Sequence, residues 1–301
     1  MKKLRIGSRA SNLAMIQTNW VADLIRRLLP ELEIEIIQIQ THGDRVQDLP
    51  LDKLNDKGVF IKELERALLT GEVDLAVHSM KDMPSELTDG LELLPPPKGE
   101  DPADVLILDK PLKDISQLSK LRIGSGSKRR RYQLETIFPG IEVLSIRGNI
   151  ETRIGKIRTE GLDGVILAKA GILRAGYGSQ ISYTFDPKSF LPAPCQGMLG
   201  IQIRTSDADL KGELSALADR ATTLRWEAER EFQREIGAGC HSPVGIYSEV
   251  QENQIFLWGM FGDEQGSVLL YDEISGRLSD RLELARVLAG RLKEAVWQRD
   301  L

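Results

Sequence analysis

The sequence predicts an α/β protein made of two related lobes, followed by a small α+β domain at the carboxyl end. The pentapeptide Leu-Arg-Ile-Gly-Ser occurs twice, at 4–8 and again at 121–125, each time as a short apolar strand pattern that runs into a helix pattern. Short apolar strand patterns alternate with amphipathic helix patterns as far as residue 203, which is typical of α/β sheets. Beyond residue 243, strand patterns instead follow one another before a final helix.

The repeated pentapeptide also indicates a ligand class. A strand that ends where a helix begins leaves backbone N–H groups unpaired, and the helix dipole adds positive potential, so such an end favours anions. Arg9 and Ser11 follow the first copy, and Ser127, Arg129 and Arg130 follow the second. We interpret the two copies as the ends of two lobes that share one anionic ligand, with ordinary strand-to-helix turn chemistry as the alternative.

The first lobe contains strand and helix patterns that alternate with short breaks. In order, the patterns are a strand at 4–8, a helix from Ser11 to Pro30, a strand at 33–39, a loop at 41–58, a helix at 59–69 and a buried strand at 74–79. Lys81 and Asp82 directly follow the last of these strands. Because open α/β sheets bind ligands at the carboxyl ends of their strands, this pair is expected at a binding edge.

The second lobe begins after a proline-rich segment between Pro95 and Pro102, which we interpret as a hinge. Its expected elements are strands at 104–108, 121–125, 142–146 and 163–168, and helices at 128–137, 149–159 and 170–175. A second segment with prolines and a glycine, at 191–197, interrupts the regular patterns. The strand expected at 199–203 follows it and is predicted to return to the first lobe.

The remaining residues have the pattern of a separate domain. A helix is expected at about 219–236, strands near 244–249, 254–260 and 267–273, and a last helix at about 279–298. The predicted domains are therefore 1–97 with 199–217, then 98–198, and finally 218–301.

Bulk composition excludes several classes of protein. With 301 residues, 41% hydrophobic and 28% charged, the chain can bury a substantial core, and its net charge of −5 argues against a nucleic-acid or membrane-surface binder. No apolar run approaches the roughly 20 residues of a membrane span, and the first residues lack the apolar segment of a signal peptide. Two cysteines provide no disulfide framework, so a reducing cytoplasm is expected. The three histidines show no ligand spacing, so no metal site is expected.

Arginines gather in the second lobe. Arg129, Arg130 and Arg131 open one helix pattern, Arg147 ends an apolar strand, and two more are Arg153 and Arg174. Guanidinium groups bind carboxylate or phosphate through paired donors. The alternative is a solvated basic face, which suits Arg131 better than Arg147.

Two other positions are candidates for chemistry. Asp82 follows a buried strand beside Lys81 and near His78, where burial and neighbouring charges can shift a pKa; the alternative is an aspartate that caps the turn before Pro84. Cys240 follows a glycine-rich segment, which suits a nucleophile or an attachment point. The alternative for Cys240 is a small residue packed in a domain corner.

Taken together, these motifs resemble the porphobilinogen deaminase (hydroxymethylbilane synthase) family, and the resemblance extends from residue 4 to beyond 245. Four residues depart from the family's usual pattern: His42, Lys169, Cys195 and Gln202. The motifs that carry the resemblance are 9–11, 57–65, 76–84, 124–130, 147–149 with Arg153, 191–197 and 239–240.

The resemblance implies two lobes like those of type II periplasmic binding proteins plus a third domain. It implies an enzyme, a cytoplasmic and monomeric transferase of haem and chlorophyll biosynthesis, that condenses four porphobilinogen molecules head to tail with loss of ammonia and hands hydroxymethylbilane to the next pathway enzyme. It also implies a dipyrromethane cofactor joined to Cys240 through a thioether. The alternative from the residues alone is a two-lobed small-anion-binding protein without enzymatic activity.

Site roles follow from the same resemblance. Asp82 and Lys81 would be catalytic, with Asp82 as the central acid/base. The cofactor would be held by Ser11, Lys81, Ser127, Arg129, Arg130 and Arg147. The substrate would be held by Arg9, Phe60, Arg147, Arg153, Arg174 and Gln196.

Overall fold

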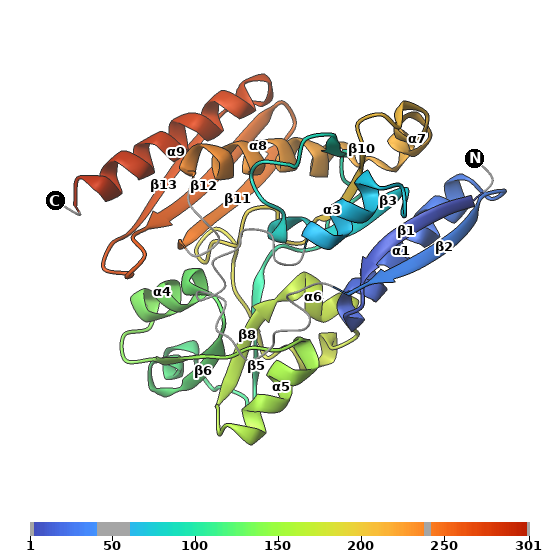
Figure 1. Ribbon diagram of the computed structural model, residues 1–301. Coiled ribbons are helices and arrows are strands. Elements are labelled where there is room, and N and C mark those ends of the chain that lie inside the picture. Colours follow the sequence, from blue (N-terminus) through green and yellow to red (C-terminus); the bar gives the residue numbers. More distant parts are fainter. Residues whose placement is uncertain (1–2, 41–60, 238–241, 300–301) are drawn as a thin grey trace. The chain divides into compact units, whose positions relative to one another are not determined.

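The computed structural model describes residues 3–40, 61–237 and 242–299 (Figure 1). The chain divides into two compact units. The first contains residues Met1–Glu100 and Gly197–Trp226, and the second contains Asp101–Gln196 and Glu227–Leu301. The chain therefore leaves the first unit after Glu100 and returns to it at Gly197.

The first unit is built on a five-stranded sheet with the order β2-β1-β3-β10-β4. Strands β1, β2 and β3 run parallel, whereas β10 is antiparallel to both β3 and β4. The strands are β1 (Lys3–Arg9), β2 (Glu33–Ile39), β3 (Leu75–Ser79), β4 (Leu91–Leu93) and β10 (Leu199–Arg204). The sheet thus includes a strand from far along the sequence.

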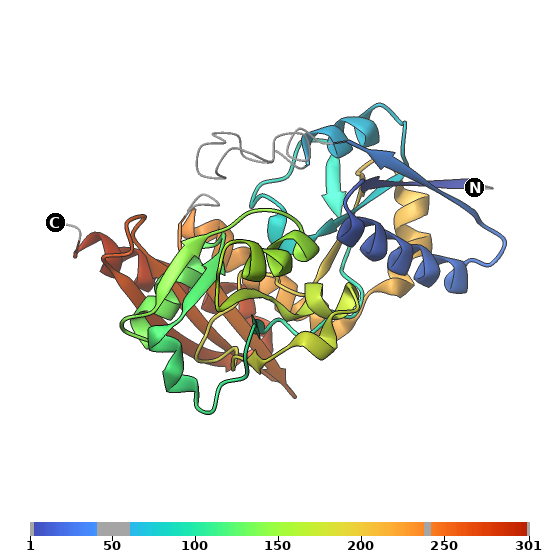
Figure 2. The same cartoon turned by 90° about the horizontal axis from the view of Figure 1, so that it is seen from below.

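Helices cover both faces of this sheet. The helices of the unit are α1 (Asn12–Leu28), α3 (Lys62–Leu69) and α7 (Ala208–Leu214), and α8 (Arg220–Ile236) begins in it. Apolar residues of α1 pack on one face with Leu75 and Val77, and those of α3 pack on the other with Ala76. Figure 2 shows α1 in blue along β1 and β2. Burial on both faces explains why β3 reads as a continuous apolar run.

The second unit contains a five-stranded sheet with the order β7-β6-β8-β5-β9. Its strands are β5 (Asp104–Leu108), β6 (Arg122–Ser125), β7 (Glu142–Ser145), β8 (Gly164–Ala168) and β9 (Tyr183–Thr184). Its helices are α4 (Lys128–Ile137), α5 (Ile150–Thr159) and α6 (Lys169–Arg174). A residue of α4 packs in one core cluster, and residues of α5 and α6 pack in the other.

The two sheets share one topology, so the repeated pentapeptide is a structural repeat. In each copy the arginine N–H donates to the aspartate before the neighbouring strand, Arg5 to Asp74 at 2.8 Å and Arg122 to Asp163 at 2.8 Å. The glycine of the second copy is tightly packed: a Cβ at Gly124 would lie 2.7 Å from Ile146 Cδ1. Only glycine fits so close an approach between strand and neighbouring side chains.

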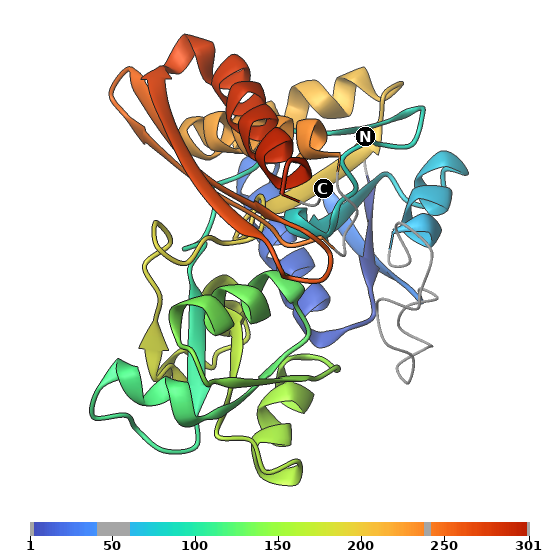
Figure 3. The same cartoon turned by 90° about the vertical axis from the view of Figure 1, so that its left-hand side faces the viewer.

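The carboxyl-terminal part of the second unit is a three-stranded antiparallel sheet, β11 (Val244–Gln251), β12 (Gln254–Gly262) and β13 (Leu269–Arg277). The long helix α9 (Arg281–Trp297) lies across one face of it (Figure 3). Gly259 permits this packing, because a Cβ there would lie 2.9 Å from Leu288 and 3.0 Å from Leu292 of α9.

The predicted fold class, two related α/β lobes plus a small α+β part, is confirmed. The expected strands at 33–39 and 104–108 and the helix at 128–137 have the predicted bounds. Strands β4 and β9 and helix α7 were not expected. The division into three domains stays a prediction. Within the described ranges, no helix is both long and apolar enough to cross a membrane.

Candidate active site

Four predicted site residues of the first lobe lie at one edge of its sheet. Arg9 ends β1, Ser11 starts α1, and Lys81 and Asp82 belong to the 3-10 turn Met80–Asp82 that follows β3. Because β1 and β3 run parallel, their carboxyl ends meet at the same edge. Ser11 Oγ accepts a hydrogen bond from the N–H of Ala14 at 3.4 Å, as expected of a helix cap.

Asp82 itself is exposed. Its carboxylate accepts no hydrogen bond from any residue in the described ranges, so the turn-capping alternative has no support there. The turn is held instead by backbone contacts, in which Met80 N–H donates to Met198 O at 3.0 Å and Met83 N–H donates to Met80 O at 3.1 Å. Asp82 is therefore a carboxylate presented to solvent from a fixed turn.

A buried chain of side-chain hydrogen bonds, which we call the relay, begins at His78 in the strand that leads into this turn. His78 Nε2 is 3.0 Å from Gln202 Oε1, Gln202 Nε2 donates to Glu65 Oε1 at 2.9 Å, and Thr88 Oγ1 donates to Glu65 Oε2 at 2.6 Å. Because the Gln202 amide donates to Glu65, its oxygen faces His78, and the histidine must carry its proton on Nε2. Burial and then the positive charge of Arg9 lower the pKa of His78 to about 4. His78 is thus a neutral interior histidine.

The second lobe presents two helix starts at the carboxyl ends of its parallel strands. Ser127 Oγ accepts from the N–H of Arg130 at 3.4 Å at the start of α4, and Asn149 Oδ1 accepts from the N–H of Thr152 at 2.8 Å at the start of α5. Gly148 precedes Asn149 with a φ of 116°, a left-handed conformation that glycine adopts without strain. Both helix starts have the capped geometry that leaves further N–H groups for an anion.

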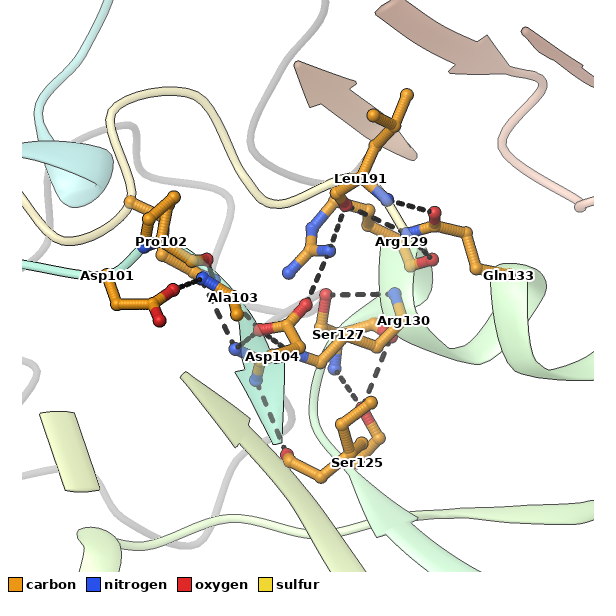
Figure 4. A network of polar contacts seen from close by, with 12 residues as sticks. Asp101, Pro102, Ala103, Asp104, Ser125, Ser127, Arg129, Arg130, Gln133 and Leu191 are labelled. Carbon is orange, nitrogen blue, oxygen red and sulfur yellow. Dashed lines mark hydrogen bonds and ion pairs between the residues drawn. The ribbon is translucent and has the colours of Figure 1, made fainter. Parts of the chain in front are cut away.

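Three predicted site residues of this lobe contact Asp104, an acid that sequence reasoning missed. Arg129 and Arg130 donate to its carboxylate (Figure 4), and Gln196 Nε2 also donates to it, at 2.9 Å. Asp104 is the first residue of β5, where it pairs with Ala168 at the carboxyl end of β8. Its side chain is fully buried, and those of Arg129 and Arg130 are only 5% and 6% exposed. Burial alone would raise the pKa of Asp104, but the attraction of the two guanidinium groups outweighs it and holds the pKa well below its usual range.

Arg147 differs from these two arginines. It is half-buried after β7, and its Nη1 is buried without a hydrogen-bond partner among the described residues. Arg153 Nε donates to Gly148 O at 2.7 Å, which places its guanidinium beside the start of α5. Arg174 is the last residue of α6. Arg131, in contrast, is 54% exposed and pairs with Glu135 at 2.8 Å, as a surface residue does.

Two predicted site residues, Cys240 and Phe60, lie outside the described residues. Asp104 and the relay partners Gln202 and Glu65 were missed by the site prediction. Asp104 had one signal in the sequence, a charged residue at the first position of an otherwise apolar strand. Glu65 had another, since it lies on the apolar face of its helix, one residue after Leu64.

Comparison with known proteins identifies the family. Residues 4–212 match the model "Porphobilinogen deaminase, dipyromethane cofactor binding domain", and residues 223–294 match "Porphobilinogen deaminase, C-terminal domain". The chain belongs to the porphobilinogen deaminase family. Similar relatives include the porphobilinogen deaminase of Clostridioides difficile strain 630, 44% identical over 285 residues (94% of this chain and 95% of that one). Another is that of Clostridium novyi strain NT, 41% identical over 291 residues (95% of this chain and 97% of that one).

Among solved structures, the chain is similar to the periplasmic aliphatic sulphonate binding protein SsuA from Escherichia coli. The sequences are 15% identical, with 79% of this chain and 73% of that chain covered and a TM-score of 0.43. The Bordetella pertussis BvgS periplasmic VFT2 domain is 14% identical, with 76% and 92% covered and a TM-score of 0.43.

The family membership confirms the predicted class of function. The chain is a transferase of tetrapyrrole biosynthesis, and its first matched region is of the type that binds the dipyrromethane cofactor. The non-enzymatic anion-binding alternative is not favoured, because both family models together cover most of the chain.

Proposed function

We propose that this chain joins four porphobilinogen molecules head to tail, releases one ammonia from each, and delivers the linear tetrapyrrole hydroxymethylbilane, whose hydroxyl group comes from one water molecule when the finished chain is released. In each addition the bond between the aminomethyl carbon and nitrogen of the substrate breaks, and ammonia leaves. The same carbon then bonds to the free ring carbon at the end of the growing chain, which loses its proton. Positive charge develops on the substrate pyrrole when ammonia leaves, so a nearby carboxylate lowers the barrier.

Asp82 is proposed to supply that carboxylate. It is exposed at the carboxyl edge of the first lobe, on a turn fixed by backbone hydrogen bonds, with Lys81 as its neighbour. It stabilises the positive charge and handles the proton of the leaving amine, while Lys81 and Arg9 bind carboxylate groups at the same edge. Ser11 adds the capped helix start.

The observation that carries the proposal is the positive edge of the second lobe. The Nη1 atom of Arg147 is buried without a partner among the described residues, which is costly unless a ligand completes it. Arg153 and the capped starts of α4 and α5 lie at the same edge. Carboxylate-bearing pyrroles match this set of donors, because each ring offers two anionic groups to guanidinium and backbone N–H groups.

The same donors fit the dipyrromethane cofactor. Ser127, Arg129, Arg130 and Arg147 would hold its carboxylates, Arg153, Arg174, Gln196 and Phe60 would hold the substrate, and Cys240 would attach the cofactor through a thioether. When bound, the cofactor supplies the free ring carbon from which the product chain grows. We further propose that the chain works as a cytoplasmic monomer and hands its product to the next enzyme of the pathway.

The attachment is tested by intact mass of the full chain purified from cells that make porphobilinogen. We expect a mass two linked pyrrole units above that of the sequence, with the addition on the peptide that contains Cys240. Cys240→Ser should abolish the addition, and the matched control Cys195→Ser should retain it. An unmodified wild-type mass, or an addition on Cys195, would contradict the proposal.

A further inference from the structure

We propose that Asp104 is a positioning residue for cofactor binding: it holds Arg129 by one guanidinium nitrogen so that the rest of that guanidinium can receive a cofactor carboxylate. This inference rests on the proposed function, in which Arg129 binds the cofactor. Asp104 itself does not touch the ligand, and it acts through the arginine.

The carboxylate of Asp104 accepts hydrogen bonds from two nitrogens of Arg130 but from only one nitrogen of Arg129. Arg130 donates to Oδ1 from Nε at 3.1 Å and from Nη2 at 2.8 Å, and its Nη1 lies 3.5 Å from Ile166 O. All three of its nitrogens therefore already have an acceptor within the protein, so the contact with the cofactor proposed above for Arg130 would have to share one of them. Arg129 donates to Oδ2 from Nη1 at 2.8 Å, and the same nitrogen donates to Leu191 O. Among the described residues, Nε and Nη2 of Arg129 donate no hydrogen bond within the protein.

The charge balance of the cluster points to an anion. Two guanidinium groups and one carboxylate leave a surplus of one positive charge in a buried network. Burial lowers the pKa of Arg129, and the positive charge of Arg130 lowers it further, although Asp104 opposes both. One carboxylate bound to the unused nitrogens of Arg129 would neutralise the cluster.

A second contact fixes the same nitrogen of Arg129. The side-chain amide of Gln133 grips the backbone of Leu191, donating to its oxygen at 3.0 Å and accepting from its N–H at 2.7 Å (Figure 4). Gln133 is fully buried, so Leu191 O is a rigid acceptor for Arg129. Nη1 is thus held between two fixed oxygens, one on Asp104 and one on Leu191.

Residues 191–192, which include the acceptor of Arg129, also contact β11, the strand that follows Cys240 in the sequence. The N–H of Ile246 in β11 donates to Pro192 O at 3.0 Å, and a Cβ at Gly245 would lie 3.0 Å from Leu191 Cβ. Strand β11 begins at Val244, four positions after Cys240. Residues 191–192 therefore set the position of the arginine relative to the strand that leads from the attachment cysteine.

The test measures cofactor loading. The full chain is produced in cells that make no porphobilinogen, porphobilinogen is then added over a range of concentrations, and the loaded fraction is read by intact mass. Asp104→Asn should raise the concentration for half-loading about tenfold or more, the effect of losing one charged hydrogen bond. Loading of Asp104→Asn at wild-type concentrations would overturn the proposal.

The matched control is Asp74→Asn. Asp74 is also a buried carboxylate that holds an arginine, since Arg5 donates to it from Nε at 3.1 Å and from Nη2 at 2.7 Å. It lies at the amino end of β3, opposite the edge that carries the site residues. Asp74→Asn should lower the thermal midpoint of the unloaded chain and leave half-loading unchanged. An equal loss of loading in both variants would show a general structural effect and overturn the proposal.

A charge-matched double variant keeps the test decisive if Asp104→Asn fails to fold. Asp104→Asn with Arg130→Gln keeps one surplus positive charge but removes the anchor of Arg129. Because Arg130 is itself assigned to the cofactor, the double variant is compared with Arg130→Gln alone, and it should load more weakly than that single variant. Loading of the double variant as strong as that of Arg130→Gln would show that Asp104 only balances charge, and would overturn positioning. Arg129→Leu separates the two proposals: if it loads poorly while Asp104→Asn loads normally, only positioning fails; if it loads normally, the assigned role of Arg129 fails.

Discussion

The first and second lobes are built on one frame and differ at one edge. In both, a Leu-Arg-Ile-Gly-Ser strand lies between two parallel neighbours, and an antiparallel strand pairs with the third parallel strand. That antiparallel strand begins with Leu199 opposite Ser79 in the first lobe, and with Asp104 opposite Ala168 in the second. The first lobe presents an exposed acid, Asp82, at this edge, whereas the second presents arginines and a buried acid.

This difference shows that the strand arrangement shared by the two lobes fixes the edge at which polar groups lie. The individual side chains at that edge then determine its chemistry. The aspartates that repeat in both lobes, Asp74 and Asp163, accept backbone N–H groups at the opposite edge of the sheets. They maintain the frame and have no part in the proposed chemistry. We therefore expect the reaction rate to respond most to Asp82 of the first lobe, and carboxylate binding to respond most to the arginines of the second.

The largest expected effect is at Asp82. Asp82→Asn keeps the shape and loses the charge, so turnover should fall about a thousandfold while cofactor loading and thermal stability stay near wild type. Asp82→Glu keeps the charge but moves it by one methylene, and should retain part of the activity. The measurement is single-turnover consumption of porphobilinogen beside thermal unfolding. An Asn variant with a wild-type rate would remove the catalytic role from the first lobe.

A second prediction separates the lobes by pH. The pKa of His78 is about 4 in the folded chain, against about 6.5 in an unfolded one, so the unfolded state binds more protons between these values. The stability that neutral His78 provides is complete above pH 6.5 and is lost as the pH falls toward 4, by about 3 kcal/mol in all. The lowered pKa of Asp104 in the second lobe changes stability only at lower pH. The contribution of ionised Asp104 to the free energy of unfolding is complete above about pH 4 and is lost only below that pH.

Urea unfolding of wild type and His78→Gln between pH 7 and 4.5 measures this effect. The glutamine can still donate to Gln202 but does not titrate, so its free energy of unfolding should fall less steeply below pH 6.5. Parallel curves for the two proteins would contradict a neutral, buried His78.

The third prediction compares two arginines of the second lobe. Arg147→Leu should weaken cofactor loading or raise the KM for porphobilinogen about tenfold to a hundredfold, as the loss of a buried charged hydrogen bond does. Arg131→Leu is the matched control, because Arg131 is exposed and pairs with Glu135. Equal and mild effects at both positions would instead favour a solvated basic face.

The smallest expected effect is at the point where the chain leaves the second lobe. Cys195 is buried with a φ of 59°, a left-handed conformation that costs an L-residue about 1–2 kcal/mol. Cys195→Gly should therefore be more stable than Cys195→Ala by about 1 kcal/mol, since both lose the thiol and only glycine relieves the backbone. Thermal unfolding compares them, and a more stable alanine variant would argue against strain at this position.

Much of the frame could be predicted from local patterns. Apolar runs and capping residues located β2, β5 and α4, and Ser11, Ser127 and the residue before α5 act at helix starts as such patterns suggest. Strands β4 and β9 were missed because three and two residues are too short to show a period.

The charge cluster of the second lobe could not be predicted. Asp104 and Arg129 are far apart in sequence, and they meet only because β5 is antiparallel to β8 and starts at the carboxyl edge of the sheet. Strand direction is a property of the assembled sheet, so no local pattern carries it. For the same reason Arg130 could be assigned to the site but not to its buried partner.

The order of strands in the first sheet has a consequence for synthesis. Strand β10 lies between β3 and β4, yet it is translated after the whole of 101–196. At translation rates of about 5–20 residues per second, roughly 5–20 s pass before β10 is available to pair with β3. The inserted lobe has all five of its own strands by then and can fold first. The chain emerges amino end first, but the lobe that contains its amino end is the later one to be completed.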